Sequence, residues 1–283
     1  MRVGLTGASG FIGGHLVWRL LEDGHEVVSL GRTRPSRAVE HRHYDLAEMA
    51  PPPLDGDLDA FVHLAAVVDT DDPPLPAHLT ANVGASWILA DWSRNHGVRH
   101  LHASTGGVYG CGPDPFTESH PLVPVDSYSI TKAMAETAVG AVNPEAVMIR
   151  YFFPYGPGTP NPIPSMLAGL GEGRPIQARP DGGPRLNPIH VDDAVEATLR
   201  LLDDTTTGPL NVAGAEVISF SELATLGARL MGASVGWEPV EAGALHPYYR
   251  SDVVGDTTRM EEALGLESFT PLQRGLRELV EQM

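Results

Sequence analysis

The sequence has little cysteine and few basic residues, and each shortage excludes a class of protein. Its one cysteine, Cys111, leaves no internal disulfide framework and is typical of a reducing compartment. Beside Gly and Pro, this thiol is interpreted as incidental rather than as a nucleophile. Lys and Arg number 19 against 36 Asp and Glu, a formal net charge of −17. Such a charge argues against nucleic acid or an anionic membrane surface as a partner.

Long apolar runs are also missing. The longest, "AFVHLAAVV" at 60–68, contains a histidine and is far too short to span a membrane. The opening "MRVGLTG" lacks the charged segment and apolar stretch of a signal peptide, so we expect a cytoplasmic protein with no membrane partner. With 283 residues, 42% of them hydrophobic, the chain can bury one large core, or a main core with a smaller satellite.

The first half of the chain alternates short apolar runs with helical patterns. This rhythm predicts an α/β fold: a doubly wound parallel sheet (Rossmann) with helices on both faces, joined by right-handed crossovers. The expected strands are residues 2–7, 25–30, 59–68, 98–105 and 145–152, and the expected helices are 11–24, 80–97 and 127–142.

Beyond Tyr151 turn residues become frequent, and the pattern predicts a smaller, partly interleaved α/β cap that binds the substrate. We predict a dinucleotide-binding domain of residues 1–152 plus 186–213. The cap would comprise 153–185 and 214–283. A capping box from Ser219 to Glu222 marks the start of one cap helix. In this half, helices are expected at 165–173, 190–204, 219–232, 257–265 and 270–283, a strand at 208–214, and proline-rich loops at 154–164 and, earlier, at 50–56 and 69–76.

Three glycines follow the first expected strand and open the first expected helix. In "TGASGFIG", Gly7 would permit a tight turn, Gly10 would let the backbone approach a pyrophosphate, and Gly13 would allow close helix–strand packing. The pyrophosphate would then sit on the helix N-terminus, where free N–H groups favour an anion. The order strand, glycines, helix predicts a dinucleotide site.

A residue that distinguishes NAD from NADP is expected at the end of the second strand. An acidic residue there selects NAD, whereas an arginine accommodates the 2′-phosphate of NADP. The sequence has Arg32, with Arg34 and Arg37 as helpers, and no Asp or Glu before Glu40. NADP is therefore favoured, with NAD as the alternative; the other interpretation is a solvated basic loop.

The segment "YSITK" supplies Tyr128 and Lys132, four residues apart on one helical face. A neighbouring ammonium favours the phenolate of a tyrosine, which is otherwise a poor acid–base group at neutral pH. "HAST" would bring the Thr105 hydroxyl to the carboxyl edge of the sheet, where ligands bind in such folds. Together with the glycine turn and Thr105, the Tyr128–Lys132 spacing is a strong indication of a catalytic site.

Motifs along essentially the whole chain resemble one family. They are "TGASGFIG", "FVHLAA" (61–66), "NVGAS" (82–86), "STGGVYG" (104–110), "YSITK", "RYFFPYGPG" (150–158), "IHVDDA" (189–194) and "NVAG". The chain resembles an extended short-chain dehydrogenase/reductase of the NAD(P)-dependent epimerase/dehydratase family, which includes UDP-galactose 4-epimerase and related nucleotide-sugar reductases.

The resemblance implies roles for individual residues. Tyr128 would be the proton donor and acceptor, Lys132 its pKa-lowering and ribose-binding partner, and Thr105 the hydroxyl that orients the substrate carbonyl. Asp45 would lie near the adenine, and Asn82 would help hold the central strands and loops. The expected cofactor contacts are Gly7, Ser9, Gly10, Phe11, Ile12, Gly13, Arg32, Asp45, Leu46, Leu64, Ala65, Ala66, Asn82, Tyr128, Lys132 and Tyr151, and the expected substrate contacts are Val67, Thr105, Gly106, Phe153, Arg185, Asn187 and Arg250.

Three departures from the family pattern narrow the reaction. Dehydratases of the family have an Asp-Glu pair where this chain has Gly106 and Gly107, so sugar 4,6-dehydration is not expected. Phe153 replaces an asparagine common in nucleotide-sugar enzymes. Arg185 lies one residue farther from "IHV" than in the epimerases, although it and Arg250 could still grip a diphosphate. The alternative for both arginines is ordinary surface ion pairing.

These patterns lead to one expected activity and two alternatives. The H-x-H pairs His41/His43 and His100/His102 lack further ligands, so no metal site is expected. We expect an NADP-dependent oxidoreductase that interconverts a ketone and a secondary alcohol on a nucleotide-activated sugar or similar polar ring metabolite, as a homodimer. The alternatives are a sugar epimerase that keeps NAD bound, and a non-catalytic NADP-sensing protein on the same fold.

Overall fold

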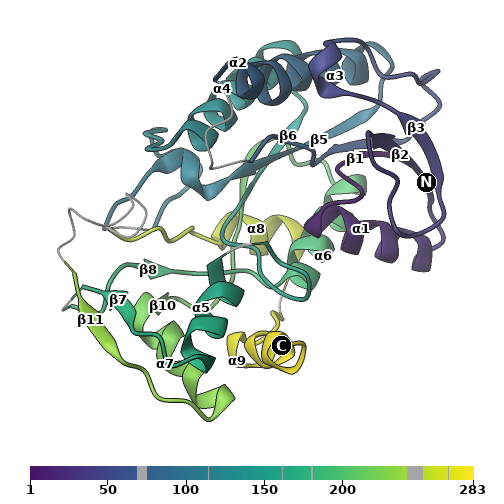
Figure 1. The fold of residues 1–283 in the computed structure, drawn as a ribbon. Helices are drawn as coiled ribbons and strands as arrows, with labels where there is room; N and C mark the ends of the chain where they lie inside the picture. The colour runs from purple at the N-terminus through teal and green to yellow at the C-terminus, as the bar shows by residue number, and fades with distance from the viewer. Residues whose placement is uncertain (69–74, 114, 161, 180, 241–250, 267) are drawn as a thin grey trace.

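The computed structural model describes residues 1–68, 75–113, 115–160, 162–179, 181–240, 251–266 and 268–283. Parallel strands form its main sheet, in the order β3-β2-β1-β4-β5-β6-β9 (Figure 1). This order runs outward in both directions from β1, which confirms the doubly wound fold predicted from the sequence. The strands are β1 (Arg2–Thr6), β2 (Glu26–Gly31), β3 (Glu40–His43), β4 (Ala60–His63), β5 (Arg99–Thr105), β6 (Val147–Tyr151) and β9 (Gly208–Val212).

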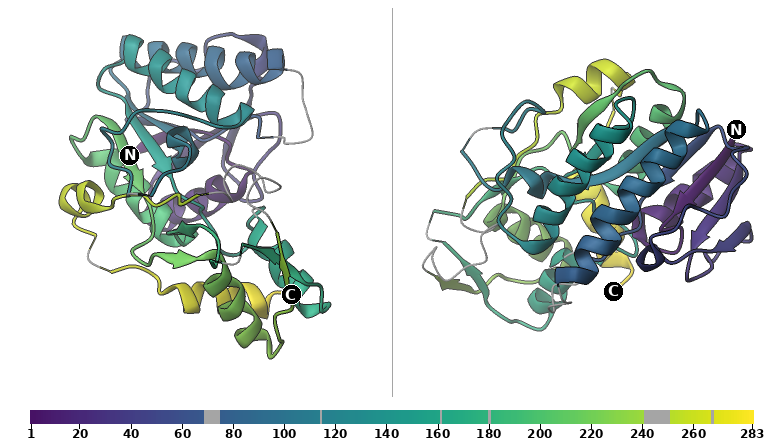
Figure 2. Two further views of the ribbon diagram at one scale, coloured as in Figure 1. Left: turned by 90° about the vertical axis from the view of Figure 1, so that its left-hand side faces the viewer. Right: turned by 90° about the horizontal axis from the view of Figure 1, so that it is seen from above.

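Helices cover both faces of this sheet (Figures 1 and 2). No helix within the described part of the chain combines the length and apolar character needed to cross a bilayer. The main core lies under α1 and α6, where Leu5, Leu16, Ile149 and Leu201 are completely buried. One face carries α2 (Leu75–His78), α3 (Ala85–Asn95) and α4 (Ser127–Val142), and the other carries α1 (Phe11–Glu22), α6 (Val191–Asp203) and α8 (Thr258–Leu264).

The strand predicted at 59–68 is shorter in the structure. Only Ala60–His63 pairs with the neighbouring strands β1 and β5. Leu64 N still donates to Thr6 O at 3.3 Å, after which the chain leaves the sheet at its carboxyl edge. The prediction was wrong over 64–68 because an apolar run fits a buried loop as well as a buried strand.

The helix predicted at 80–97 begins in a different geometry. Leu79–Gly84 (η2) forms π-helical turns, and α3 follows from Ala85. Such wide turns are frequent at functional sites, and this one directs Asn82 toward the loop after β4. Of the loop predicted at 69–76, residues 69–74 lie outside the described residues. Leu75 and Pro76 already belong to α2, so this loop was predicted too long.

The cap forms a separate layer below the sheet in Figure 1. Its own apolar core contains Leu167, Leu223 and Leu276. The predicted capping box is confirmed, since Ser219 Oγ accepts from Glu222 N and the Glu222 carboxylate accepts from Ser219 N. The cap elements are α5 (Pro162–Gly171), α7 (Phe220–Met231), α9 (Leu272–Glu281) and the strand pairs β8 (Arg185–Leu186) with β10 (Ile218–Ser219) and β7 (Ile176–Ala178) with β11 (Trp237–Pro239).

One helix from the range assigned to the cap lies elsewhere. α8 packs on α6 and β9, and its Met260 and Leu264 belong to the main core. The two parts of the chain are therefore interleaved more deeply than the sequence suggested. The division into a dinucleotide-binding domain and a cap stays a prediction, which the separate apolar core of the cap supports.

Candidate active site

The turn between β1 and α1 forms a backbone cradle. Gly7 has a φ of 76°, a left-handed conformation that favours glycine, and a Cβ there would lie 2.8 Å from Ala65 N. A Cβ on Gly13 would lie 2.0 Å from Gly7 O, so glycine is needed for α1 to pack this closely on the strand end. Gly10 N donates to Gly7 O at 2.9 Å and closes the turn.

The N-terminus of α1 is open to an anion. Gly10 at the N-cap provides no side-chain cap, and the first turn contains no acidic residue. The unpaired N–H groups and the positive end of this 12-residue helix therefore suit a pyrophosphate. Ser9, Phe11 and Ile12, which were also predicted as contacts, lie in the same turn. The cradle thus fits a dinucleotide.

Three arginines follow β2 and have no carboxylate partner among the described residues. The side chains of Arg32, Arg34 and Arg37 are exposed, and none makes an ion pair or hydrogen bond with another residue that the structure describes. On the adjacent strand, by contrast, Arg42 pairs with Glu40 at 2.8 Å. Unpaired guanidinium groups at this strand end are suited to phosphate oxygens.

Asp45 and Leu46 lie where the adenine was expected, at the carboxyl end of β3. Asp45 caps the short helix η1 (Leu46–Glu48), since its Oδ1 accepts from Ala47 N at 2.9 Å. Leu46 is half-buried against the apolar cluster beside β2. Both residues are therefore held at the rim of the sheet by local structure.

A directional hydrogen-bond chain joins the cradle to the helices above it. Ala65 N donates to Thr6 Oγ1 at 3.2 Å, and this hydroxyl lies 2.6 Å from His63 Nδ1. Ser86 gives its only hydroxyl proton to a carbonyl, so it accepts from His63 Nε2, and the neutral ring accepts the Thr6 proton on Nδ1. His63 then carries its proton on Nε2 and donates to Ser86 Oγ at 3.1 Å. Ser86 in turn donates to the carbonyl of Asn82 at 2.7 Å. Burial holds the pKa of His63 well below its usual range, so the chain is built on a neutral imidazole.

Asn82 connects the loop after β4 with α4. Its Oδ1 accepts from Val67 N at 2.7 Å, and its Nδ2 donates to Val67 O at 2.9 Å and to Thr131 Oγ1 at 3.0 Å. Thr131 donates onward to the carbonyl of Tyr128 at 2.8 Å. Asn82 thereby ties the predicted cofactor contacts Leu64, Ala65, Ala66 and Val67 to the helix that carries the predicted catalytic residues.

The three predicted catalytic residues lie on two neighbouring elements. Thr105 is the last residue of β5, and its hydroxyl oxygen caps the short helix η3 (Gly106–Tyr109). Tyr128 and Lys132 occupy successive turns of α4, whose first turn is capped by Asp126. Because α4 packs on both β5 and η3, the helix with Tyr128 and Lys132 lies against the strand that ends at Thr105.

Burial acts in opposite directions on the tyrosine and the lysine. It raises the pKa of Tyr128 to about 12, and the carboxylate of Asp126 acts in the same direction. It lowers the pKa of Lys132 to about 8, which Glu136 partly opposes. At neutral pH the phenol is protonated and the ammonium is still charged, although its pKa lies closer to neutrality than that of an ordinary lysine. Tyr128 can ionise only when positive charge is added or held beside it.

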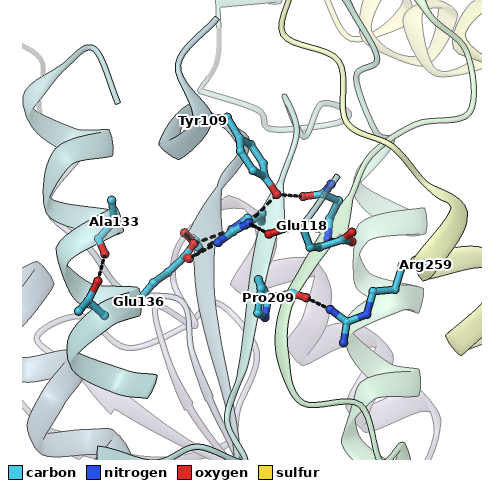
Figure 3. A network of polar contacts seen from close by, with 10 residues as sticks. Tyr109, Glu118, Ala133, Glu136, Pro209 and Arg259 are labelled. Carbon is cyan, nitrogen blue, oxygen red and sulfur yellow. Dashed lines mark hydrogen bonds and ion pairs between the residues drawn. The ribbon is translucent and has the colours of Figure 1, made fainter. Parts of the chain in front are cut away.

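Behind these residues lies a buried polar network (Figure 3). Arg150 of β6 and Glu136 of α4 form an ion pair with Nη2–Oε2 of 2.6 Å, and their side chains are 4% and 5% exposed. Ser104 donates to the Glu136 carboxylate, Arg150 donates to the Tyr109 hydroxyl, and Tyr109 donates to Asn211 Oδ1 at 2.8 Å. The network joins α4 to β5, β6 and β9, and therefore fixes the helix with the tyrosine against the strand with the threonine.

Packing shapes two of the positions that were predicted to contact the substrate. A Cβ on Gly106 would lie 2.6 Å from the ring of Phe152, so an acidic side chain there would have to displace a buried phenylalanine. Phe153, directly after β6, has a φ of 44°, a left-handed conformation that bulky residues rarely adopt. Its half-buried ring contacts the apolar core of the cap and the cluster around Phe152. Strain of this kind is concentrated at ligand sites.

Other predicted contacts are engaged within the protein. Arg185 is paired with Asp252, with Nη2–Oδ2 of 2.7 Å, and would have to share or leave this carboxylate to bind a diphosphate. Asn187 uses its amide on backbone groups of two neighbouring loops. The hydroxyl of Tyr151 is hydrogen-bonded inside the main core. Arg250 lies outside the described residues.

The sequence interpretation missed His102, whose Nε2 lies 3.4 Å from Lys132 Nζ. The pair His100/His102 was considered only as a metal site, and among the residues with described coordinates no three His, Cys, Asp or Glu side chains form a possible metal site. Polar residues at alternate positions of an apolar run could have indicated buried, hydrogen-bonded histidines. No sequence pattern indicated the Glu136–Arg150 ion pair, because its two residues lie on different elements, a helix and the strand that follows it.

Comparison with known proteins identifies the class. The NAD dependent epimerase/dehydratase family matches residues 3–213, and the chain belongs to this family. The resemblance expected from the motifs is thereby confirmed.

Individual relatives cover nearly the whole chain. The UDP-glucose 4-epimerase of Mycolicibacterium smegmatis is 33% identical, with 99% of this chain and 98% of that protein covered. The dTDP-4-dehydro-6-deoxy-D-allose reductase of Streptomyces bikiniensis is 29% identical, with 97% and 93% covered. The structure of MoeE5 in complex with UDP-glucose and NAD is similar with a TM-score of 0.81 and 26% identity, covering 99% of this chain and 98% of that one.

Proposed function

We propose that this protein is an NADP-dependent oxidoreductase that interconverts a ketone and a secondary alcohol on a nucleotide-activated sugar or similar polar ring metabolite. It would act in the cytoplasm as a homodimer. The observation that carries the proposal is the placement of Tyr128 and Lys132 on successive turns of α4, which packs on β5, the strand that ends at Thr105. The reductase and epimerase names of the relatives support a nucleotide-sugar substrate.

Each residue of the site would have its own role in binding or proton transfer. The cradle would hold the pyrophosphate, and Lys132 would bind the ribose next to the nicotinamide. When bound, the nicotinamide accepts or supplies the hydride. Thr105 would orient the substrate oxygen by a hydrogen bond. Tyr128 would donate a proton to the carbonyl oxygen in reduction and remove it from the hydroxyl in oxidation.

A sugar 4-epimerase is the second candidate. Two observations favour it: the relative with 33% identity is a UDP-glucose 4-epimerase, and MoeE5 was solved with UDP-glucose and NAD. An epimerase would use the same Tyr128, Lys132 and Thr105 but would keep NAD bound and return the hydride to the opposite face of the sugar. The unpaired arginines after β2 favour NADP, and with it the reductase.

Product analysis separates these candidates. We would incubate the purified protein with UDP-glucose, UDP-galactose, a dTDP-hexose, a GDP-hexose and a dTDP-4-keto-6-deoxyhexose, each in a separate reaction with NADPH or NADH. Products would be followed by NMR and mass spectrometry. Oxidation of NADPH with a keto-sugar is the expected result. Interconversion of the UDP-hexoses without net cofactor turnover would instead identify an epimerase. Cofactor binding without turnover would favour the NADP sensor, and a 4-keto-6-deoxy product from a dTDP- or GDP-hexose would contradict the interpretation of Gly106 and Gly107.

The NADP preference predicts a selective effect at Arg32. Arg32→Ala is expected to weaken NADPH binding by about 10- to 150-fold, because hydrogen bonds to charged groups are worth about 1.5–3 kcal/mol. NADH affinity should scarcely change, and added salt should narrow the difference between the cofactors. Isothermal titration calorimetry measures both. Arg229→Ala, an exposed arginine on α7 of the cap, controls for loss of charge. Equal affinities in the wild type, or equal losses in Arg32→Ala, would leave the arginines as surface charge.

The homodimer would form through α3 and α4, which pack side by side. Trp87 on α3 and Ile130 and Met134 on α4 are large apolar side chains that are 42–45% exposed. Burying such side chains against a second copy would remove apolar surface from water. Light scattering should therefore find a dimer in the wild type and a folded monomer for Ile130→Glu/Met134→Glu. A monomeric wild type would rule out this interface.

A further inference from the structure

Lys132 is the only lysine in the chain, and it is 1% exposed. A buried ammonium needs hydrogen-bond acceptors, because its hydration has been lost. Two nearby groups are already engaged. The carboxylate of Glu136 is bound by Arg150 and Ser104, and both ring nitrogens of His63 are hydrogen-bonded.

Among the residues with described coordinates, His102 is the hydrogen-bond partner of the Lys132 ammonium. It is completely buried on β5, its Nε2 lies 3.4 Å from Lys132 Nζ, and its Nδ1 has no hydrogen-bond partner within the described coordinates. Burial, and then the charge of Lys132, hold the pKa of His102 well below its usual range, so the imidazole is neutral. A neutral imidazole has one N–H and one lone pair, and only the tautomer protonated on Nδ1 offers its lone pair to the ammonium.

We propose that His102 is a positioning residue for Lys132: its Nε2 accepts a hydrogen bond from the ammonium and holds the charged side chain in place. The inference deepens the proposed function and rests on it, since a charged Lys132 is what would favour the phenolate of Tyr128. His102 itself would touch neither substrate nor cofactor.

Few charged groups other than Glu136 lie near Lys132 in the described part of the chain, so a hydrogen bond to His102 can change its protonation measurably. Glu136, one turn further along α4, favours the ammonium at a distance, and Tyr128 lies one turn before it. The His63 ring stands 5.4 Å from that of His102 and is neutral. The other titratable side chains on the elements packed against α4 are His78 on α2, Asp91 and Arg94 on α3, Arg99 and His100 on β5, and Tyr109 on η3.

The single lysine allows a direct measurement. Protein labelled with ¹³C,¹⁵N-lysine gives one side-chain signal, whose titration with pH reports the protonation of Lys132 without any substrate or added cofactor. We expect the midpoint to fall by about one pH unit in His102→Phe, because a hydrogen bond to a charged group is lost. His100→Phe, a control at an equally buried histidine of the same strand, should leave the midpoint unchanged.

Two amide variants test whether the position of Nε2 matters. The amide of Gln reaches about where Nε2 lies, whereas that of Asn reaches only to Nδ1. His102→Gln should therefore keep a midpoint near that of the wild type, and His102→Asn should behave like His102→Phe. This pair decides the question even if His102→Phe does not fold. An unchanged midpoint in His102→Asn, or a loss equal in Gln and Asn, would overturn the proposal.

The tautomer gives a second readout on the wild-type protein. Long-range ¹H–¹⁵N spectra should show His102 protonated on Nδ1, with its signals identified by their loss in His102→Gln. Protonation on Nε2 would contradict the proposal. If these measurements fail while Tyr128→Phe still abolishes turnover, only the role of His102 is wrong. If they succeed while Tyr128→Phe remains active, the proposed function is wrong.

Discussion

Replacing Tyr128 with phenylalanine is expected to reduce kcat by about 10²- to 10⁴-fold, the usual contribution of a positioned acid or base. The substitution removes the proton that would pass to and from the substrate oxygen, and it leaves the ring to fill the same space. Cofactor affinity should survive, because the cradle is built by the turn between β1 and α1 and does not involve the phenol. Steady-state kinetics and calorimetry on the same preparation measure both quantities.

Tyr155→Phe is the matched control for this experiment. Tyr155 is buried, but its hydroxyl lies against Gly275 of α9 in the cap, away from the predicted catalytic residues. Loss of this phenolic oxygen should leave kcat within a few-fold of the wild type. Activity of Tyr128→Phe close to that of the control, with any genuine substrate, would remove the basis for assigning acid–base chemistry to α4.

Removing the buried ion pair behind the site is expected to have the largest effect on stability. Arg150→Met leaves the Glu136 carboxylate buried without its partner, and breaking such pairs from one side costs about 3–5 kcal/mol. The substitution also leaves the Tyr109 hydroxyl without the guanidinium that donates to it and that lies 4.7 Å from its ring. Urea unfolding followed by circular dichroism gives the change in the free energy of unfolding.

Two further variants test the cause of that loss. In Arg150→Met/Glu136→Gln no charge remains unpaired, so part of the stability should return. Arg174→Met removes one half of a surface pair with Glu172, whose side chains are 62% and 64% exposed, and should cost at most about 1 kcal/mol. A loss in Arg150→Met as small as in Arg174→Met would mean that the network does not hold α4 against the sheet.

Local chemistry was enough to predict much of this protein from its sequence. The helix 127–142 was predicted from its helical pattern with the bounds it has, and the structure shows that Asp126 caps its first turn. The glycine turn was predicted because Gly7, Gly10 and Gly13 stand between an apolar strand pattern and a helical pattern. In both cases the information lies within a few residues along the chain, so that the sequence by itself determines the outcome.

Only the tertiary structure determined which distant residues contact the helix 127–142 and the loop after β4. His102 meets Lys132 across 30 residues, and Asn82 meets Thr131 across 49, because parallel strands and their helices bring distant segments to one edge of the sheet. The same crossovers place α8 in the main core rather than in the cap. An apolar or polar residue type is compatible with many partners, and only the packed fold determines which partner it receives. Lys132 therefore meets a histidine of β5 that the sequence of its own helix does not reveal.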